Sequence, residues 1–514
     1  MKPYALFLFL LAAALLVAGA ARARATAAWT AKTDPALLAA MAGGDAAEFL
    51  VVLTAQGDPT GAARLGDKTA RGQYVYDTLT AVAARAQAPL RALLDARGAD
   101  YRAYWIHNML WVRGDRGLVQ VLAARPDVAY VYANTAQQVA LPAPQAAARA
   151  TQAGVEWNIA QVNAPQVWAA GVTGQGAVIG GQDTGYQWDH EALKSQYRGW
   201  NGSTAAHAYN WHDAIHTNNP NTTPGNPCGF DAPAPCDDQG HGTHTMGTMV
   251  GTQPDPPVGI GMAPGAQWIG CRNMEEGWGT PATYAECYEW FIAPYPIGGD
   301  PFTDGDPSKA PDVINNSWSC PPVEGCAASD VLLAAVEAVR AAGILSVHSA
   351  GNSGPGCQTI TTPAAIYDAS FTVGATDPDG QIAALSSRGP VMIDDSGRLK
   401  PDIVAPGIAV RSSYPNGGYT TLSGTSMAAP HVAGLAALLI SADPALAGQV
   451  DALEALVTAN SIHLTSAQDC GNLGGDIPNN VYGWGRIDAL ATYEALEPSP
   501  PLPFRAFVPA APGQ

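Results

Sequence analysis

The sequence predicts an α/β protein in which helices cover both faces of a mostly parallel sheet, preceded by a small α+β domain. From about residue 155 to 495, short apolar strand candidates alternate with helical stretches and Gly-rich links. That alternation is typical of a parallel sheet between two helical layers. A shorter strand–helix pattern, which ends near residue 135, forms the first domain.

Composition and charge limit the classes of function that the protein can have. The chain has 514 residues, of which 47% are apolar and 14% charged, as in a compact globular protein. Residues 1–150 carry 15 Lys and Arg against 10 Asp and Glu, whereas residues 151–514 carry 11 against 34. Because residues 151–514 are strongly acidic, they repel phosphate backbones. No nucleic-acid partner is therefore expected.

The N-terminus predicts a signal peptide over residues 1–27. Lys2 is followed by an apolar run from Ala5 to Val17 and then by small-residue cleavage patterns. The run is shorter than the roughly 20 residues that span a bilayer. We therefore expect a secreted, extracellular protein without a stable membrane anchor.

Residues 46–135 predict a small domain. EFLVVLT (48–54) is β-rich, residues 74–96 have helical periodicity, and YWIHNMLWV (104–112) is typical of a strand. A second helix over 117–124 and a strand over 128–132 complete a β-α-β-α-β order, in which the middle strand can also be split into a hairpin. A linker rich in Ala, Pro and Gln follows over 136–152, and a Pro-rich tail occupies 496–514.

The region 153–495 is predicted to be one catalytic domain. Its strand candidates are Ala177–Gly181, Gln267–Cys271, Asp312–Asn316, Gly343–Val347 and Phe371–Val373. Its helices are expected around His241–Thr252, Thr283–Ile292, Asp330–Ala342 and Ser426–Ile440. Folds of this kind place function at the carboxyl ends of the strands.

All eight cysteines follow residue 150, and disulfides persist outside the cytosol. Eight cysteines allow 105 pairings. Short loops favour Cys228–Cys236, Cys271–Cys287 and Cys320–Cys326, which leaves Cys357 with Cys470. Zinc is the alternative, but no paired C-x-x-C spacing occurs, so no metal site is predicted.

Four short motifs carry chemistry-bearing residues. They are DTG (183–185), GHGTHTMGT (240–248), SAGNSGPG (349–356) and GTSMAAPHVAG (424–434). Taken alone, Asp183 is a turn or cap residue, Asn352 a turn residue and Ser426 a helix N-cap. His244 is better interpreted as a buried packing residue than as a metal ligand, because the pattern H-E-x-x-H is absent.

Together the motifs resemble the signature segments of the subtilase family of serine peptidases. Asp183, His241 and Ser426 follow the chain order Asp…His…Ser of subtilisin. The similarity spans roughly residues 155–490 and implies a three-layer subtilisin-like fold. Residues 46–135 resemble the family's inhibitor-like, ferredoxin-like propeptide, which implies an intramolecular inhibitor that is later cleaved away.

The resemblance implies a role for each residue. Ser426 would be the nucleophile, His241 the general base, and Asp183 the group that orients the imidazole. Asn352 would donate to the oxyanion. Residues Asn316, Ser317, Trp318 and Ser319 would form an edge strand that pairs with substrate, and Gly351 would wall the specificity pocket.

The chain departs from the family's common pattern in three places. Trp318, Ser319 and Cys320 replace smaller apolar and glycine residues, and Gln182 replaces an aliphatic residue before Asp183. Ala192 falls where many relatives carry a calcium-binding Asp, so calcium is not expected at that position, although it could bind elsewhere. The chemistry requires no cofactor.

Two other functions are weaker. An α/β-hydrolase esterase would need Asp and His after Ser426, and the downstream His431 lies too close. A binding protein with a decayed site is disfavoured because every catalytic position is filled. We therefore expect a monomeric secreted endopeptidase for protein or peptide substrates, made as a precursor that cleaves itself within residues 133–154.

Overall fold

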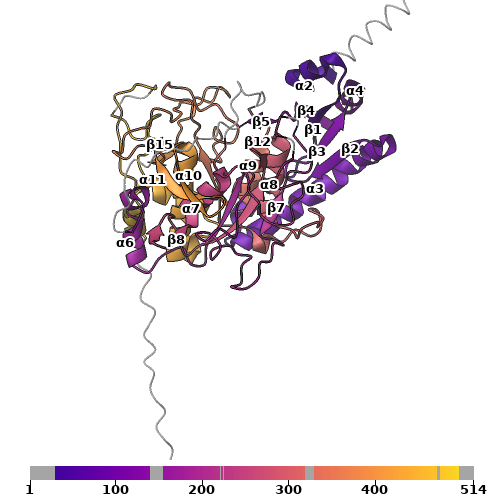
Figure 1. Ribbon diagram of the computed structural model, residues 1–514. Coiled ribbons are helices and arrows are strands. Elements are labelled where there is room, and N and C mark those ends of the chain that lie inside the picture. Colours follow the sequence, from indigo (N-terminus) through magenta and orange to yellow (C-terminus); the bar gives the residue numbers. More distant parts are fainter. Residues whose placement is uncertain are drawn as a thin grey trace, which may run out of the picture.

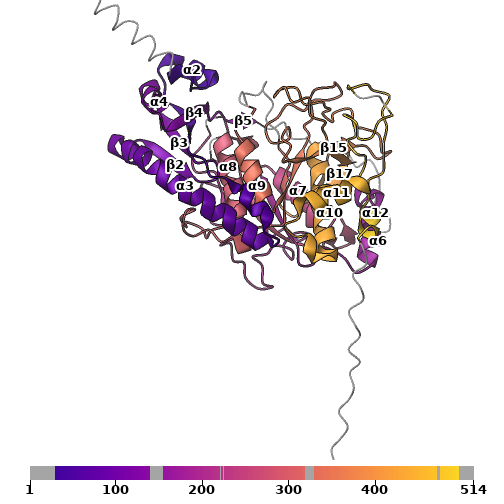
Figure 2. The ribbon, with the colours of Figure 1, turned by 180° about the vertical axis from the view of Figure 1, so that it is seen from behind.

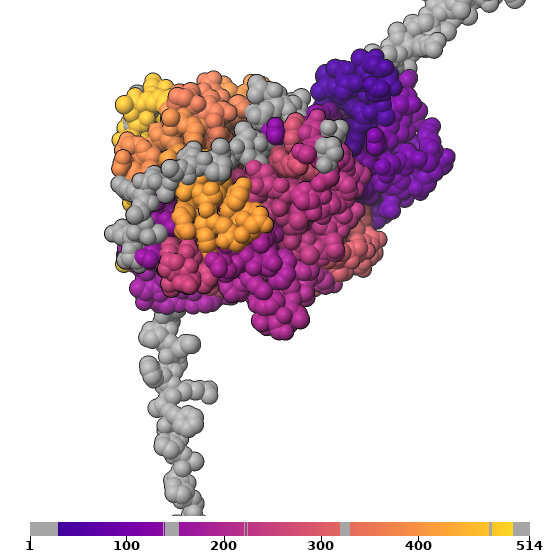
Figure 3. Space-filling model, in the orientation of Figure 1, coloured from indigo at the N-terminus to yellow at the C-terminus, as the bar shows by residue number. Residues whose placement is uncertain are grey.

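The computed structural model describes residues 29–138, 154–219, 221–223, 225–318, 329–471 and 475–496. The predicted signal peptide, most of the predicted linker and almost all of the predicted tail lie outside these residues. Figures 1 and 2 show a small N-terminal domain, with its long helix α3, against a larger body. In the space-filling view of Figure 3 the N-terminal domain is a separate lobe on one side of that body.

The N-terminal domain is a four-stranded antiparallel sheet in the order β2-β3-β1-β4. Its elements are α2 (Pro35–Ala40), η1 (Met41–Gly43), β1 (Ala47–Leu53), η2 (Pro59–Arg64), α3 (Lys68–Arg97), β2 (Asp100–Tyr104), β3 (Met109–Gly114), α4 (Arg116–Ala123) and β4 (Val128–Ala133). This is the expected ferredoxin-like arrangement. Of the two alternatives for residues 104–112, the hairpin is confirmed and the single strand is not, because a turn at residues 105–108 separates β2 from β3.

Strand β1 explains how this domain joins the body. Phe49 and Val51 pack with Leu90 of α3 in a cluster internal to the domain. The alternate residues Leu50 and Val52 belong to a second cluster, which includes side chains of the catalytic domain. Because successive side chains of a strand point to opposite faces, β1 is buried on both sides and the two domains share one apolar contact.

The body contains a seven-stranded sheet in the order β16-β15-β14-β13-β6-β10-β7, and every neighbouring pair is parallel. Its strands are β6 (Val178–Asp183), β7 (Trp211–Asp213), β10 (Gln267–Arg272), β13 (Val313–Asn316), β14 (Leu345–Ser349), β15 (Phe371–Thr376) and β16 (Ile403–Pro406). The five predicted strands are all present. Strands β7 and β16 were not predicted.

Helices cover both faces of the sheet, as expected for a three-layer fold. The helices of the body are α5 (Trp157–Gln161), α6 (Ala164–Ala169), α7 (His241–Val250), α8 (Pro281–Ile292), α9 (Leu333–Ala341), α10 (Thr425–Ala442), α11 (Val450–Ala459) and α12 (Ala489–Glu494), with η3 (Pro307–Lys309) and η5 (Pro444–Leu446). On β13, Val313 packs in the cluster of α7 and α10, whereas Ile314 packs in that of α8 and α9. The sheet therefore separates these two helical layers.

Helix α10 forms the centre of one layer. Within the described residues it is the one helix long and apolar enough to cross a membrane, and 89% of it is buried inside the protein. Its apolar composition is therefore accounted for by packing against the sheet and α7.

The remaining strands form short antiparallel pairs. They are β8 (Thr252–Pro254) with β9 (Pro257–Gly259), β17 (Val410–Tyr414) with β18 (Gly418–Leu422), and β11 (Met274–Glu275) with β12 (Trp278–Gly279) and β5 (Gln137–Gln138). Because the central strands are parallel, their carboxyl ends meet at one edge of the sheet. Asp183 ends β6, Asn316 ends β13 and Ser349 ends β14 at that edge.

Three disulfides cross-link the described part of the body. They are Cys228–Cys236, Cys271–Cys287 and Cys357–Cys470, the pairs predicted from loop length. Cys271–Cys287 ties β10 to α8 and closes a loop worth about 3 kcal/mol in the chain-entropy model. Cys320 and Cys326 lie outside the described residues, so their pairing stays a prediction.

Candidate active site

A buried carboxylate–imidazole pair lies at the carboxyl edge of the sheet. His241 Nδ1 and Asp183 Oδ1 are 2.8 Å apart, and the two side chains are 1% and 0% exposed. Asp183 Oδ1 also accepts the Thr184 N–H at 2.8 Å, and Oδ2 accepts the Thr245 hydroxyl at 3.3 Å. The second ring nitrogen, His241 Nε2, has no hydrogen-bond partner within the described structure. The pair thus presents one free imidazole nitrogen.

Glycines allow this close approach. His241 begins α7 directly after Gly240, whose φ of 105° lies in the left-handed region that favours glycine. A Cβ at Gly242 would lie 2.1 Å from the Gly185 carbonyl and 3.0 Å from Asp183 Cβ. The first turn of α7 can therefore pack onto the DTG turn only because residue 242 lacks a side chain.

Ser426 lies in the first turn of α10, which packs beside α7. Its side chain is 3% exposed, and its hydroxyl donates to the Ser317 carbonyl at 3.1 Å. The Ser317 hydroxyl donates in return to the Ser426 carbonyl at 2.8 Å. In this structure the Ser426 hydroxyl is therefore paired with Ser317, while His241 Nε2 remains free.

The side chain of Asn352 is oriented by the residue before Ser426. Its Oδ1 accepts both the Thr425 N–H at 2.9 Å and the Thr425 hydroxyl at 3.0 Å. A backbone N–H can only donate, so the amide oxygen faces Thr425 and the amide NH₂ points away from it. Asn352 is exposed. The structure thus brings Asn352 next to the start of α10 with a donor group directed to open space.

A carboxylate that sequence reasoning missed supports this arrangement. Asp237 accepts the Gly240 N–H at 2.7 Å, the Thr243 N–H at 2.9 Å and the Thr184 hydroxyl at 2.9 Å. It therefore joins the turn before His241 to the residue after Asp183. Burial raises the pKa of Asp237, while its hydrogen bonds with Thr243 and Gly240 lower it.

Comparison with known proteins matches this geometry to one family. The model of the subtilase family, Peptidase_S8, matches residues 174–485, which contain Asp183, His241, Asn352 and Ser426. The chain belongs to the subtilase family.

Three relatives show how far the similarity extends. The subtilase is 37% identical over 420 residues to Bacillopeptidase F of Bacillus subtilis (strain 168), a match that covers 78% of this chain and 27% of that protein. It is 35% identical over 236 residues to Serine protease AprX of the same organism, covering 41% and 51%. It is 32% identical over 294 residues to Subtilisin DY of Bacillus licheniformis, covering 57% and 86%. The chain thus spans about a quarter of Bacillopeptidase F and about half of AprX, within a family of hydrolases that act on peptide bonds.

The predicted substrate segment of the subtilase begins inside the central sheet. Asn316 ends β13, an interior strand between β6 and β14, and its side chain is 0% exposed. Asn316 itself is therefore part of an interior strand, because hydrogen-bonded strands flank β13 on both sides, and the pairing of residues 317–319 with substrate stays a prediction. Ser317 is also buried and contacts Ser426, whereas Ser319 lies outside the described residues.

Two further departures from the family pattern have structural reasons. Trp318 is 2% exposed and stacks on Tyr284 of α8, with ring centroids 3.9 Å apart. Gln182 donates to Asn316 Oδ1 and accepts from Asn273 Nδ2 at 2.9 Å, so it joins β6 to both neighbouring strands through side chains. Gly351 has a φ of 98°, and its N–H donates to the Thr425 hydroxyl at 3.1 Å.

An edge strand for an extended peptide exists elsewhere in the subtilase, at β12. Residues Gln137 and Gln138, which follow the N-terminal domain, form β5 and pair antiparallel with Gly279 and Trp278. The outer edge of the β11–β12 hairpin is thus occupied by this chain's own segment. A two-residue strand carries no sequence periodicity, which is why the sequence did not predict it.

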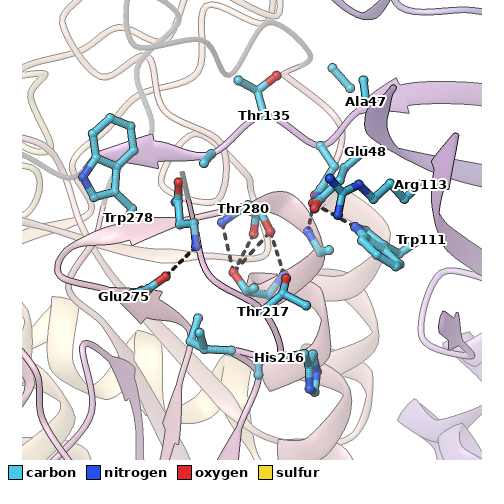
Figure 4. A pocket seen from close by; sticks show the side chains of 18 of the residues that line it. Ala47, Glu48, Trp111, Arg113, Thr135, His216, Thr217, Glu275, Trp278 and Thr280 are labelled. Carbon is cyan, nitrogen blue, oxygen red and sulfur yellow. Dashed lines mark hydrogen bonds between the residues drawn. The ribbon is translucent and has the colours of Figure 1, made fainter. Parts of the chain in front are cut away.

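A cavity of about 490 Å³ lies beside β5, between the two domains. Figure 4 shows Glu48, Trp111 and Arg113 on the side of the N-terminal domain and Glu275, Trp278 and Thr280 on the catalytic side. Glu48 accepts the Trp111 indole N–H at 3.1 Å and the Asn134 amide at 3.0 Å. This junction contains the point where the chain leaves the N-terminal domain.

Two other sequence interpretations concern metal sites. His244 is 0% exposed and its Nε2 lies 3.1 Å from the Val410 carbonyl, as expected of a buried packing residue, and burial lowers its pKa to about 3. Ala192 is buried with Val258 and Ile260, so apolar side chains surround that position. No cluster of three or more His, Cys, Asp or Glu suited to a metal occurs within the described ranges.

Proposed function

We propose that this subtilase is a secreted serine endopeptidase that cleaves protein or peptide substrates through Asp183, His241 and Ser426. The observation that carries the proposal is the buried Asp183–His241 pair, 2.8 Å apart, with a free Nε2 and with Ser426 on the adjacent helix. Such a pair serves nucleophilic catalysis because the carboxylate fixes the imidazole tautomer and stabilises the imidazolium that forms.

The reaction follows from these positions. Rotation of the Ser426 side chain away from Ser317 would direct its hydroxyl proton to His241 Nε2 as the oxygen attacks the scissile carbonyl. The Asn352 amide and the Ser426 N–H would donate to the oxyanion. His241 then protonates the leaving amine, and water hydrolyses the acyl-enzyme by the reverse proton transfer. None of these steps needs a cofactor or metal.

The N-terminal domain would act as an intramolecular inhibitor before it is removed. Glu289 of α8 accepts the Trp105 N–H at 2.6 Å and the Ile106 N–H at 3.0 Å from the β2–β3 turn. Tyr104 donates to Glu286 at 2.9 Å, and β5 occupies the edge of β12. A segment held on this edge would exclude a substrate strand from it, and self-cleavage would take place within the interval 133–154.

Export fits this proposal. The signal-like N-terminus and the three disulfides favour an extracellular enzyme. Residues 1–27 would be removed as a signal peptide, and residues 46–135 as the propeptide.

Casein hydrolysis by the wild type and by Ser426→Ala, each with and without a serine-directed sulfonyl fluoride, tests the proposal. We expect the wild type to lose its N-terminal domain, cleave casein and be silenced by the reagent. Ser426→Ala should stay full length and inactive. A wild type that remains inert after removal of residues 1–150 would contradict the proposal and favour a binding protein.

A further inference from the structure

Two consecutive carboxylates, Asp237 and Asp238, precede the helix that begins at His241. Asp237 holds the turn around His241, as described above. Asp238 points elsewhere: its Oδ1 accepts the Glu276 N–H at 3.0 Å, and its Oδ2 lies 3.5 Å from Arg272 Nη1. One dipeptide therefore contacts both the catalytic histidine's helix and the β11–β12 hairpin.

Arg272 is a rigid partner for Asp238. Its side chain is 0% exposed and makes a two-point contact with Asp213 of β7, at 2.9 Å from Nε and 2.8 Å from Nη2. Nη2 also donates to the Gly229 carbonyl at 2.6 Å. These bonds fix the position of the guanidinium. The Asp238 side chain, which is 0% exposed, therefore lies against a cation that cannot move away.

The group that Asp238 holds is conformationally strained. Glu276 adopts φ 49°, in the left-handed region, and Gly277 follows with φ 86°. These residues form the turn between β11 and β12, and a left-handed non-glycine residue persists only where its surroundings hold it. The Glu276 carboxylate also accepts the Thr223 N–H at 3.0 Å. Contacts from two loops thus fix the turn that presents β12.

We propose that Asp238 is a positioning residue for substrate binding: through the Glu276 N–H and Arg272 it sets the β11–β12 hairpin at the distance from His241 that an extended peptide requires. This rests on the proposed function, with β12 as the edge on which substrate backbone pairs. The pairing of β5 with β12 shows that an extended chain fits that edge.

The charge of Asp238 gives the proposal a pH signature. Burial raises the pKa of Asp238 to about 7, although Arg272 and the Glu276 N–H oppose the shift. The other charged groups that face it are Asp237 beside it and Glu275 on β11, and both carboxylates raise its pKa. Asp238 therefore ionises as the pH rises through about 7, and its attraction to Arg272 is present above that pH.

Self-processed wild type and Asp238→Asn are compared on two substrates, a single-residue ester and a tetrapeptide anilide that reaches β12. Asparagine offers one oxygen and one NH₂, so it cannot accept from Glu276 and face Arg272 favourably at once. We expect KM for the anilide to rise about tenfold, because the variant loses one hydrogen bond to a charged group. KM for the ester should not change. The wild-type KM for the anilide should also fall as the pH rises through 7, and that dependence should vanish in the variant.

The exposed Asp255→Asn serves as the matched control and should behave as the wild type. An equal rise in KM with both substrates, or no rise in KM with the anilide, would overturn the proposal. Hydrogen exchange in the Ser426→Ala precursor is a second readout that needs no proteolysis. There Asp238→Asn should speed exchange of the amides of residues 275–279 and leave α7 and α10 unchanged. Unchanged exchange at 275–279 would overturn the proposal, whereas a wild type inert on both substrates would contradict only the proposed function.

Discussion

At the scale of single residues, His241 and Asn352 each have one polar side-chain atom that is hydrogen-bonded within the protein and a second one that is free. Asp183 holds Nδ1 of His241 and leaves Nε2 free, and Thr425 holds the oxygen of Asn352 and leaves its NH₂ free. Each group is thereby oriented before substrate arrives. Such pre-orientation lowers the cost of reorganisation in the transition state.

Asn352 offers a test of this orientation. Asn352→Ala should lower kcat about 10²–10³-fold with little change in KM, the loss that removing this kind of donor causes in subtilisin. The matched variant is Asn352→Asp, which keeps an acceptor for Thr425 but has no NH₂. Steady-state kinetics of both on one peptide decide the matter. Recovery of activity in Asn352→Asp would mean that the contact with Thr425, and not the donor, is what catalysis needs.

Gln182 tests the polar network under the site. Gln182→Leu removes the partner of both Asn273 and Asn316 in the interior of the sheet. Leaving buried amides unpaired should destabilise the protein by about 1–3 kcal/mol. The measurement is the thermal unfolding midpoint in the Ser426→Ala background, with the exposed Gln120→Leu on α4 as control. Equal midpoints for the two variants would show that the network contributes nothing to stability.

At the scale of elements, the N-terminal ends of two helices meet the carboxyl ends of the parallel strands. Helix α7 begins at His241, and α10 places Ser426 in its first turn. The short hairpin β11–β12 adds the edge on which β5 lies. The proposed catalytic groups and the edge that holds β5 thus belong to different elements, which Asp237 and Asp238 connect.

The pairing of β5 with β12 predicts how the precursor matures. In an antiparallel pair, neighbouring residues alternate between those that exchange hydrogen bonds with the partner and those that do not. Of Gln137→Pro and Gln138→Pro, one should therefore remove a ladder N–H and slow self-cleavage markedly, while the other acts as its internal control. Gel analysis of the time course of precursor conversion measures this. If both variants convert as fast as the wild type, β5 does not present the chain for cleavage.

The sequence predicts those elements that carry their own local signal. Two of the four motifs lie at strand ends and two begin helices, and their resemblance to the family's signature segments is what allowed Asp183, His241 and Ser426 to be named. Five strands of the sheet were recognised as short apolar runs. Strand β7 has three residues, and β16 follows Pro401 closely and ends at Pro406, so its sequence is typical of a loop. Asp237 and Asp238 look like turn residues in the sequence, because their partners Thr184 and Arg272 lie far away along the chain. The interior place of Asn316 could not be predicted, because the pairing order of strands is a long-range property.

At the scale of the whole molecule, a nearly neutral N-terminal domain, with 11 Lys and Arg against 10 Asp and Glu over residues 29–138, lies on an acidic catalytic domain. Lys68 at the start of α3 pairs with Asp312 at 2.6 Å, and Arg71 donates to the Gly448 carbonyl at 2.6 Å. At the other end of the contact, Glu286 accepts from Tyr104 and lies 2.8 Å from both His212 and His216. Ionised groups therefore fasten the two domains at separate places.

His216 makes this contact sensitive to pH. Burial alone would lower its pKa, but Glu286 and the hydrogen bond with Asp231 raise it from 6.5 to about 10. A raised pKa in the folded state stabilises the protein fully below about pH 6.5, and that stability is lost as the pH rises through about 10. The thermal midpoint of the Ser426→Ala precursor should therefore exceed that of its His216→Gln variant at pH 6, and the two should converge at alkaline pH. A difference that does not change with pH would contradict this assignment.

The central claim is that Ser426 is the nucleophile, and covalent labelling tests it most directly. The self-processed enzyme is treated with a biotinylated fluorophosphonate, digested, and mapped by mass spectrometry. We expect one adduct, on Ser426, formed in step with the loss of peptidase activity. It should be absent from His241→Ala freed of residues 1–150, which lacks the general base and would not process itself. An adduct on another residue, or full activity after complete labelling of Ser426, would contradict the account.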